Sequence, residues 1–364
     1  PPPPPPPPPP NFQSEDGIRD GAFGLVGSEM CIRDSRKAWW YIPKRTLGRR
    51  EKASQGEAFY TAANPPFGAT FTYYLKDSLE TSKAVRTKKE KEIAKEGGDT
   101  PYPGWDALRE EELEEKPAIL LTVTEASGEV VRRLTGPAKA GVHRVSWDLR
   151  YPSSRGWSRN WNDDNASGIL VEPGTYTVSL AKRSDGVVTD LGESQTVEVV
   201  QLRERGLKGA SPAEVVAFMR ELDAFTRRVD SADNALGEAE EQLDAIQQAL
   251  MRSTVADSSL DDKARAMWRQ VKDMQLDLSG SEMRDNSGDP GPVSIGTRLS
   301  TAWRGTGGST YGPTPMHKRQ FEIAQEEFAE LSATLSQLLE TDLPALEAEL
   351  DAAGVPWTPG RGVF

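Results

Sequence analysis

The sequence predicts a mixed α+β chain of several domains, in which an antiparallel β-sandwich precedes an antiparallel three-helix bundle. Between residues 117 and 201 apolar and polar residues alternate, which is typical of half-buried strands. Between residues 211 and 356 apolar residues recur at the spacing of amphipathic helices. Hydrophobic residues are 36% of the 364-residue chain and aromatic residues 7%, a composition that suits elongated helices and small modules.

Residues 1–35 differ in character from the rest of the chain. A run of prolines, which favours a polyproline II rod, comes first. Leu25–Ser35 reads "LVGSEMCIRDS", which looks like a translated transposase-type sequencing-library adapter, and Glu15–Asp20 resembles the other end of such an adapter. We therefore interpret residues 1–35 as a non-native, adapter-derived and disordered segment. Because Cys31, the only cysteine, lies inside it, we expect no disulfide or thiol chemistry in the authentic chain.

Residues 36–75 end in a predicted strand. Aromatic residues and threonines alternate from Phe67 to Leu75, directly after a proline-containing turn. Residues 76–116 are charged and poor in large apolar residues, which predicts a charged linker with one short helix around Lys83–Glu96. The strand must pair with a strand from another part of the fold, since a lone strand leaves its backbone groups unpaired.

Six or seven short strands are predicted within residues 117–201. The stretch "AILLTVTEASGEVVRRL" predicts two strands about a turn at Ala126–Gly128, and another turn is expected at Ser184–Gly186. Short strands with turn signals between them favour an antiparallel sandwich. The residues expected to face its core are Val145, Trp147, Leu149, Tyr176, Val178 and Leu180.

Residues 211–356 predict three helices. The first runs for about 40 residues from a capping box, in which Ser211 is the N-cap and Glu214 the third helical residue. A second is expected over Leu260–Leu278, and a third begins at Thr314, is interrupted or restarted at Pro344 and stops at Gly354. The stretches between them, residues 279–297 and 300–315, are rich in Gly, Ser and Thr and are expected to be loops.

The charge balance bears on the kinds of partner. The net charge of −12 is spread along the predicted helices, and no basic face is evident, which argues against nucleic-acid binding. No stretch reaches the roughly 18 consecutive apolar residues that a membrane helix needs, so we expect no membrane insertion. Residue spacing gives no sign of a cofactor or of a metal site, and we expect neither.

Four separated motifs occur in an order that resembles a known family. They are "ANPPFGATFTYYLKD" at residues 63–77, "HRVSWD" at His143–Asp148, "PGTY" at Pro173–Tyr176 and "LDAAGVPWTPGR" at Leu350–Arg361. Together they resemble the C-terminal region of exported bacterial proteins with sortilin-like, BNR-repeat β-propellers, often labelled glycosyl hydrolases. The resemblance covers nearly all of residues 38–364.

This resemblance implies several further properties. Residues 36–75 would be the C-terminal remnant of the propeller, and residues 117–201 would be a FlgD-type immunoglobulin-like module. The protein's own N-terminal propeller, missing here, would be the main partner. An extracytoplasmic location, periplasmic or secreted, would follow from the resemblance alone.

Few side chains stand out as functional candidates. His143, which we place on the strand face opposite Trp147, and His317 are expected to have surface roles. Glycoside hydrolysis needs two facing carboxyl groups, and the sequence offers no reason to choose a pair, so no catalytic residue is predicted. Trp303 and Tyr311 are expected to attach a Gly-rich loop to the helices.

The insertion "YPSSRGWSRNWNDDNASG" at residues 151–168 is the strongest binding candidate. Trp157 and Trp161 could stack on sugar rings, and Asp163 and Asp164 could hold a calcium ion. The alternative is that the tryptophans fold under the loop and pack against the sandwich or the helices. Of these two roles, we favour the packing role.

Three hypotheses for function follow. In the first, this chain is a non-catalytic accessory or interaction region of a propeller protein, contacting the propeller or another protein. The second makes it a glycan-binding module that uses Trp157 and Trp161. The third makes it the tail of a glycoside hydrolase whose active site lies in the missing propeller, so whether the full protein is an enzyme stays open.

Overall fold

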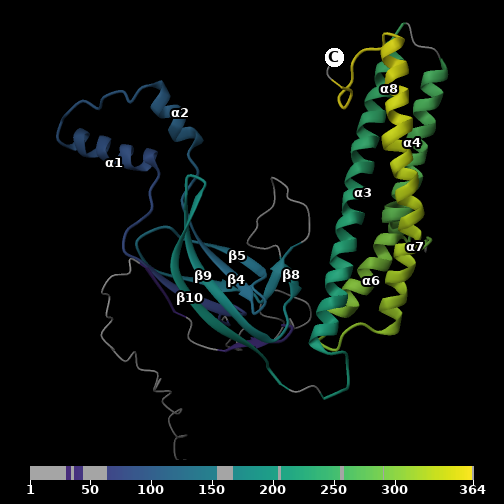
Figure 1. Ribbon diagram of the computed structural model, residues 1–364. Coiled ribbons are helices and arrows are strands. Elements are labelled where there is room, and N and C mark those ends of the chain that lie inside the picture. The colour runs from purple at the N-terminus through teal and green to yellow at the C-terminus, as the bar shows by residue number, and fades with distance from the viewer. Residues whose placement is uncertain are drawn as a thin grey trace, which may run out of the picture.

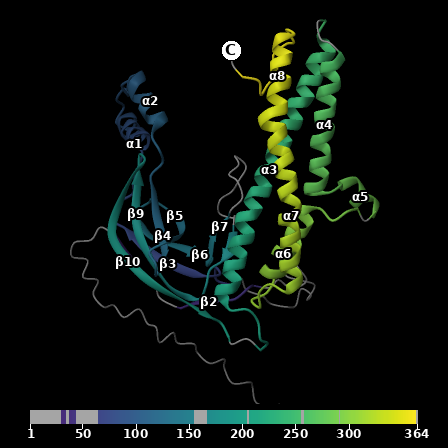
Figure 2. The ribbon, with the colours of Figure 1, turned by 45° about the vertical axis from the view of Figure 1, so that its right-hand side comes forward.

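The computed structural model describes residues 30–33, 37–43, 64–153, 167–203, 206–254, 258–289 and 291–362. It shows a mixed α+β chain, as predicted. The strands β1–β10 gather in one part, here called the sheet body, and the helices α3–α8 run as long neighbouring rods in the other, here called the helical body (Figure 1). The short helices α1 and α2 stand away from the helical body, at one end of the sheets (Figures 1 and 2).

The strands form three sheets. A five-stranded sheet has the order β2-β10-β9-β4-β5, a three-stranded sheet the order β1-β3-β6, and β7 pairs with β8. All neighbours are antiparallel except β2 and β10, which are parallel. The strands are β1 (Met30–Arg33), β2 (Ala38–Trp40), β3 (Ala69–Leu75), β4 (Ala118–Glu125), β5 (Val130–Gly136), β6 (Gly141–Trp147), β7 (Arg150–Pro152), β8 (Ser167–Leu170), β9 (Gly174–Ser184) and β10 (Val187–Gln201).

The two larger sheets share one hydrophobic core. Phe71 of β3 and Leu121 of β4 are both fully buried in it, because alternate residues of each strand point to the same side. Trp147 packs edge-on against Tyr176, with ring centroids 5.1 Å apart, and this contact joins β6 to β9. Except for Val145, which is only partly buried, the residues predicted to face the core are buried.

Strand β3 belongs to the sheet body and is not separate from it. It pairs along its whole length with β6, from Ala69 opposite Trp147 to Leu75 opposite Gly141. Its buried residues join the same core as those of residues 117–201. Part of the segment expected to be disordered also has a place in the fold, since Met30–Arg33 pairs with β3 as strand β1. Residues 1–29 lie outside the described residues.

The charged stretch after β3 contains two helices where one was predicted. Helix α1 (Ser82–Lys95) matches the expected helix, and α2 (Trp105–Leu113) was missed. Helix α2 is nine residues long and has no side-chain N-cap bond, so its start lacks the usual sequence signal.

The first long helix agrees closely with the prediction. Helix α3 begins at Pro212, and the capping box is present: Glu214 N donates to Ser211 Oγ, and Ser211 N donates to Glu214 Oε2. The helical body consists of α3 (Pro212–Arg252), α4 (Ser258–Ser279), α5 (Glu282–Ser287), α6 (Ile295–Gly307), α7 (Pro315–Gln337), a π-helical turn (Leu338–Asp342) and α8 (Leu343–Ala352). Phe225 packs edge-on against both Phe321 and Phe328, which joins α3 to α7.

The two stretches expected to be loops contain helices, so that expectation is wrong. Helix α5 lies within residues 279–297, and α6 occupies much of residues 300–315. Ser294 caps α6 by accepting from Thr297 N, and Leu299 and Ala302 are buried against the other helices. The packing of this face outweighs the low helix propensity of the Gly and Thr residues around it.

The C-terminal segment folds back on the helical body. Pro344 has no N–H to donate, and the chain forms the π-helical turn just before it, where Leu343 N donates to Leu338 O. After α8, the side chain of Arg361 is buried. It forms an ion pair with Asp351 and donates to Pro356 O at 2.9 Å. The family-like motif at residues 350–361 therefore ends in a buried structural contact.

Candidate functional site

The strongest binding candidates lie outside the described residues. Trp157, Trp161, Asp163 and Asp164 belong to the segment 154–166, which connects β7 to β8. Glycan stacking and calcium binding by these side chains stay predictions.

His143 lies on the same face of β6 as Trp147, which corrects the expectation that they point to opposite sides. Residues two and four apart in a strand share a face. The register places His143 opposite Tyr73, and their ring centroids are 5.3 Å apart. A ring nitrogen of His143 bonds to Lys139 O at 2.6 Å, so this side chain is held in place by the connection between β5 and β6.

His317 is buried, so the expectation of a surface role is wrong. Its ring nitrogen Nδ1 accepts a hydrogen bond from Thr314 N, and its backbone N–H donates one to Thr314 Oγ1. These two bonds form a capping box at the start of α7. The imidazole lies against Gly305 of α6, where a Cβ would come within 2.2 Å of Nε2. This histidine fixes the packing of α6 on α7.

Trp303 and Tyr311 occupy different surroundings. Trp303 lies within α6 and packs against the helical core, so it belongs to a helix and not to a loop. Tyr311 follows α6, and its carbonyl accepts from Ala210 N at 3.0 Å. That bond joins the segment before α7 to the segment before α3.

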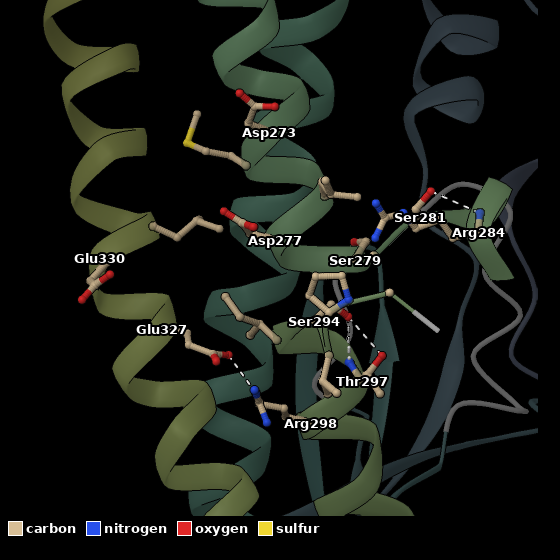
Figure 3. Close-up of a pocket in the computed structure, with 18 of the residues that line it drawn as sticks. Asp273, Asp277, Ser279, Ser281, Arg284, Ser294, Thr297, Arg298, Glu327 and Glu330 are labelled. Atoms are coloured by element: carbon tan, nitrogen blue, oxygen red, sulfur yellow. Dashed lines mark hydrogen bonds and ion pairs between the residues drawn. The ribbon is translucent and has the colours of Figure 1, made fainter. Parts of the chain in front are cut away.

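A large cavity lies within the helical body. It has a volume of about 770 Å³ and is lined by the second half of α4, by α5, by the start of α6 and by the middle of α7. Figure 3 shows Asp273 and Asp277 on one side of it and Glu327 and Glu330 on the helix opposite. Arg298 lies at the lower end.

The charges around this cavity are partly balanced by their neighbours. Arg298 Nε donates to Glu327 Oε2 at 2.9 Å, and its Nη1 donates to Gln320 Oε1 at 3.1 Å. Ser294 at the start of α6 is bonded to Thr297, so it does not point a free hydroxyl into the space. The remaining acids could attract a cation, but no described residue that lines the cavity has a buried polar side-chain atom without a hydrogen-bond partner, which would orient one.

Burial raises the pKa of tyrosines in the sheet body, and Tyr73 and Tyr176 are among them. It raises the pKa of Tyr73 to about 12 and also raises that of Tyr176. Tyr73 donates to Pro137 O at 2.6 Å and Tyr176 donates to Glu172 O at 2.7 Å, so each hydroxyl holds a strand connection. Neither tyrosine lines the large cavity.

A polar cluster joins the two bodies. Arg220 of α3 lies over the ring of Tyr151 of β7, and Glu125 of β4 accepts a hydrogen bond from each of them. Sequence reasoning missed this cluster because its members are separated by 26 to 95 positions and no motif connects them. The contacts of Arg298 with Glu327 and Gln320 were not predicted either, because no motif connects these residues.

No protein-family model matches the chain, and no match was found among curated proteins or among solved structures. In the described ranges, no group of three His, Cys, Asp or Glu residues is placed to hold a metal ion. None of the described helices has both the length and the apolar character that crossing a membrane requires.

Proposed function

We propose that this chain is a non-catalytic accessory and interaction region of a longer, exported β-propeller protein. In this proposal the sheet body is an immunoglobulin-like sandwich, and α3, α4 and α7–α8 form a three-helix bundle behind it. The four motifs, which occur in the order expected for that family, support the assignment to a propeller protein. The observation that carries the interaction role is the exposed helical pair α1–α2, here called the arm (residues 82–113).

Ionic contacts hold the arm together, because it has no core of its own. Neither helix in this fully described stretch contains a buried residue. Arg86 on α1 donates through Nε and Nη2 to the two carboxylate oxygens of Glu111 on α2, at 2.6 and 2.7 Å. Its Nη1 donates to Glu90 at 2.6 Å. Such bidentate pairs fix geometry as well as supplying attraction, so the arm keeps a defined shape.

The arm also presents large apolar side chains to solvent. Tyr102, Trp105 and Leu113 are 72%, 69% and 68% exposed. Exposed apolar side chains that gather on one element mark contact sites more often than isolated ones do. The occupant we propose is the propeller of the same protein, because the arm follows β2 and β3, the strands of the authentic chain that come first after the upstream propeller in the proposed arrangement.

The test uses the complete protein, expressed from the recovered upstream reading frame, beside this chain. Amide hydrogen exchange at residues 99–113 is expected to be slower in the complete protein, and Trp105→Ala is expected to restore fast exchange there. Trp357→Ala, which removes another half-exposed tryptophan, serves as the control. Equal exchange of the arm in both proteins would overturn the proposed contact.

Two other outcomes would overturn the proposed function. Hydrolysis of glycosides by this chain alone would make it an enzyme. A polysaccharide titration that changes tryptophan fluorescence, and that Trp161→Ala abolishes, would make it a glycan-binding module.

A further inference from the structure

A second cavity lies where the sheet body meets the helical body, and we call it the seam cavity. It has a volume of about 390 Å³. The sheet body contributes β2, β7 and β8, and the helical body contributes the start of α3 and the end of α6 with the residues after it. Figures 1 and 2 both place the first turns of α3 beside the strands. The volume falls in the range of small-molecule sites, roughly 300–1,000 Å³.

The seam cavity is cationic although the whole chain is acidic. Among the described residues that line it, the charged ones are Arg150 and Arg304, and no Asp or Glu is present. The whole chain carries a net charge of −12, so two arginines without a lining acid are unlike the average surface of this protein. Much of the remaining wall is apolar, with Trp40, Trp303 and Met219 among its residues.

Arg150 is the half-buried cation of the site. Its Nη1 donates to Gly168 O at 2.8 Å, which is the one hydrogen bond that its side chain forms with a described residue. A guanidinium carries five N–H donors, so most of them remain for a ligand. Burial lowers the pKa of Arg150, and the nearby carboxylate of Asp148, which is outside the lining, offsets this in part. A bound anion would further oppose this lowering of the pKa, because a nearby negative charge stabilises the charged guanidinium.

Two more polar groups line the same space. Thr306 is fully buried, and its hydroxyl has no hydrogen-bond partner among the described residues. A buried hydroxyl without a partner costs free energy, which a ligand oxygen would recover. The guanidinium of Arg304, in the last turn of α6, is exposed and forms no ion pair with any described residue. It can therefore turn toward a bound anion without breaking an existing contact.

We propose that the seam cavity binds a small organic carboxylate with a short apolar body. Arg150 and Arg304 receive the carboxylate, Thr306 bonds to one of its oxygens, and the apolar body lies among Trp40, Trp303 and Met219. Neutral and cationic analogues lack the charge that the two arginines require. The site is independent of the arm and of the proposed propeller contact.

Isothermal titration calorimetry on this chain, with hexanoate, hexanamide and hexylamine as matched probes, tests the proposal. Hexanoate is expected to bind at least about tenfold more tightly than hexanamide, because charge-assisted bonds exceed neutral ones by that order. Hexylamine is expected not to bind. Equal affinity for hexanoate and hexanamide, or no heat with hexanoate at millimolar concentration, would overturn it.

Variants locate the binding. Arg304→Gln, at an exposed position, is expected to weaken hexanoate about tenfold and to leave hexanamide unchanged. Arg269→Gln removes an exposed arginine outside the seam cavity and is expected to change neither. Gly307→Leu should fill the space, since a Cβ at Gly307 lies 3.7 Å from the Met219 methyl, and should block both probes. Hexanoate binding that is unaffected by Arg304→Gln and Gly307→Leu would place it elsewhere and refute the assignment.

Discussion

The guanidinium carbon of Arg220 lies 4.4 Å from the centre of the Tyr151 ring, in a contact that joins α3 to β7. The same guanidinium hydrogen-bonds to the Tyr151 hydroxyl and donates to Glu125 Oε1 at 3.3 Å. Beneath this polar cluster, Ile169 of β8 packs into the core of the helical body. The two bodies are therefore joined by both apolar and charged contacts.

Replacing Arg220 by alanine is expected to loosen this junction. A cation–π contact at a partly exposed site contributes about 0.5–1 kcal/mol, and we expect a loss of that order in the free energy of unfolding. Hydrogen exchange at β8 should become faster. Arg227→Ala, at an exposed position on the same helix, is the control. If both variants behave alike, the Tyr151 contact does not stabilise the junction.

Tyr73→Phe should destabilise the sheet body. The lost hydroxyl leaves the Pro137 carbonyl without its donor, at a cost of about 1–3 kcal/mol if that carbonyl stays buried. Chemical denaturation measures the change. Tyr74→Phe, on the exposed side of the same strand, should be nearly neutral. A Tyr73 variant as stable as the parent would show that water replaces the donor.

High pH should destabilise the chain through the same residue. The pKa of Tyr73 is about 12 in the folded state and 10.0 for a free tyrosine. Between these values the folded state keeps a proton that the unfolded state has lost, so stability is complete below pH 10 and falls as pH rises toward 12. Urea unfolding from about pH 9 to 11 should show this decline, and Tyr73→Phe should reduce its slope. Equal slopes would contradict the assignment.

Gly305→Ala should destabilise the helical body although alanine is the better helix former. The added Cβ would lie 2.2 Å from Nε2 of His317, whose ring is held by its bond from Thr314 N. Adding His317→Ala should recover part of the loss by removing the clash. Gly237→Ala, in α3 with no neighbouring atom within 4 Å, should instead stabilise by up to about 1 kcal/mol. Thermal unfolding of the three variants decides the matter, and a stabilising Gly305→Ala would refute the clash.

The adapter interpretation predicts a result at the level of DNA. Amplification of the locus from its source should yield an upstream reading frame that does not encode residues 1–35. Among the residues whose burial the structure describes, the first that belongs to the core of the sheet body is Ala38. Recovery of the same codons in frame would show that β1 is native.

Local patterns predicted most elements of this chain but not their partners. The capping box at Ser211 located the start of α3 because it is formed by residues three positions apart. The alternation of apolar and polar residues predicted which residues of β9 face the core, because residues two positions apart on a strand share a face. Helix α6 was missed because its Gly and Thr residues favour a loop, and only burial against α4 and α7 makes it a helix. The burial of His317 was also not predicted, because it depends on contact with Gly305 in another helix, which no local pattern indicates.

The α+β class, the long helix α3 and the alternating strands follow from the order of residues alone, since each depends on neighbours within a few positions. Other features are visible only in the folded chain: β3 pairs with β6, Trp40 Nε1 donates to Val171 O across 131 positions, and Arg150 and Arg304 line one cavity. Such contacts depend on how whole elements pack. No local period or motif encodes the distance between two side chains that meet only after folding.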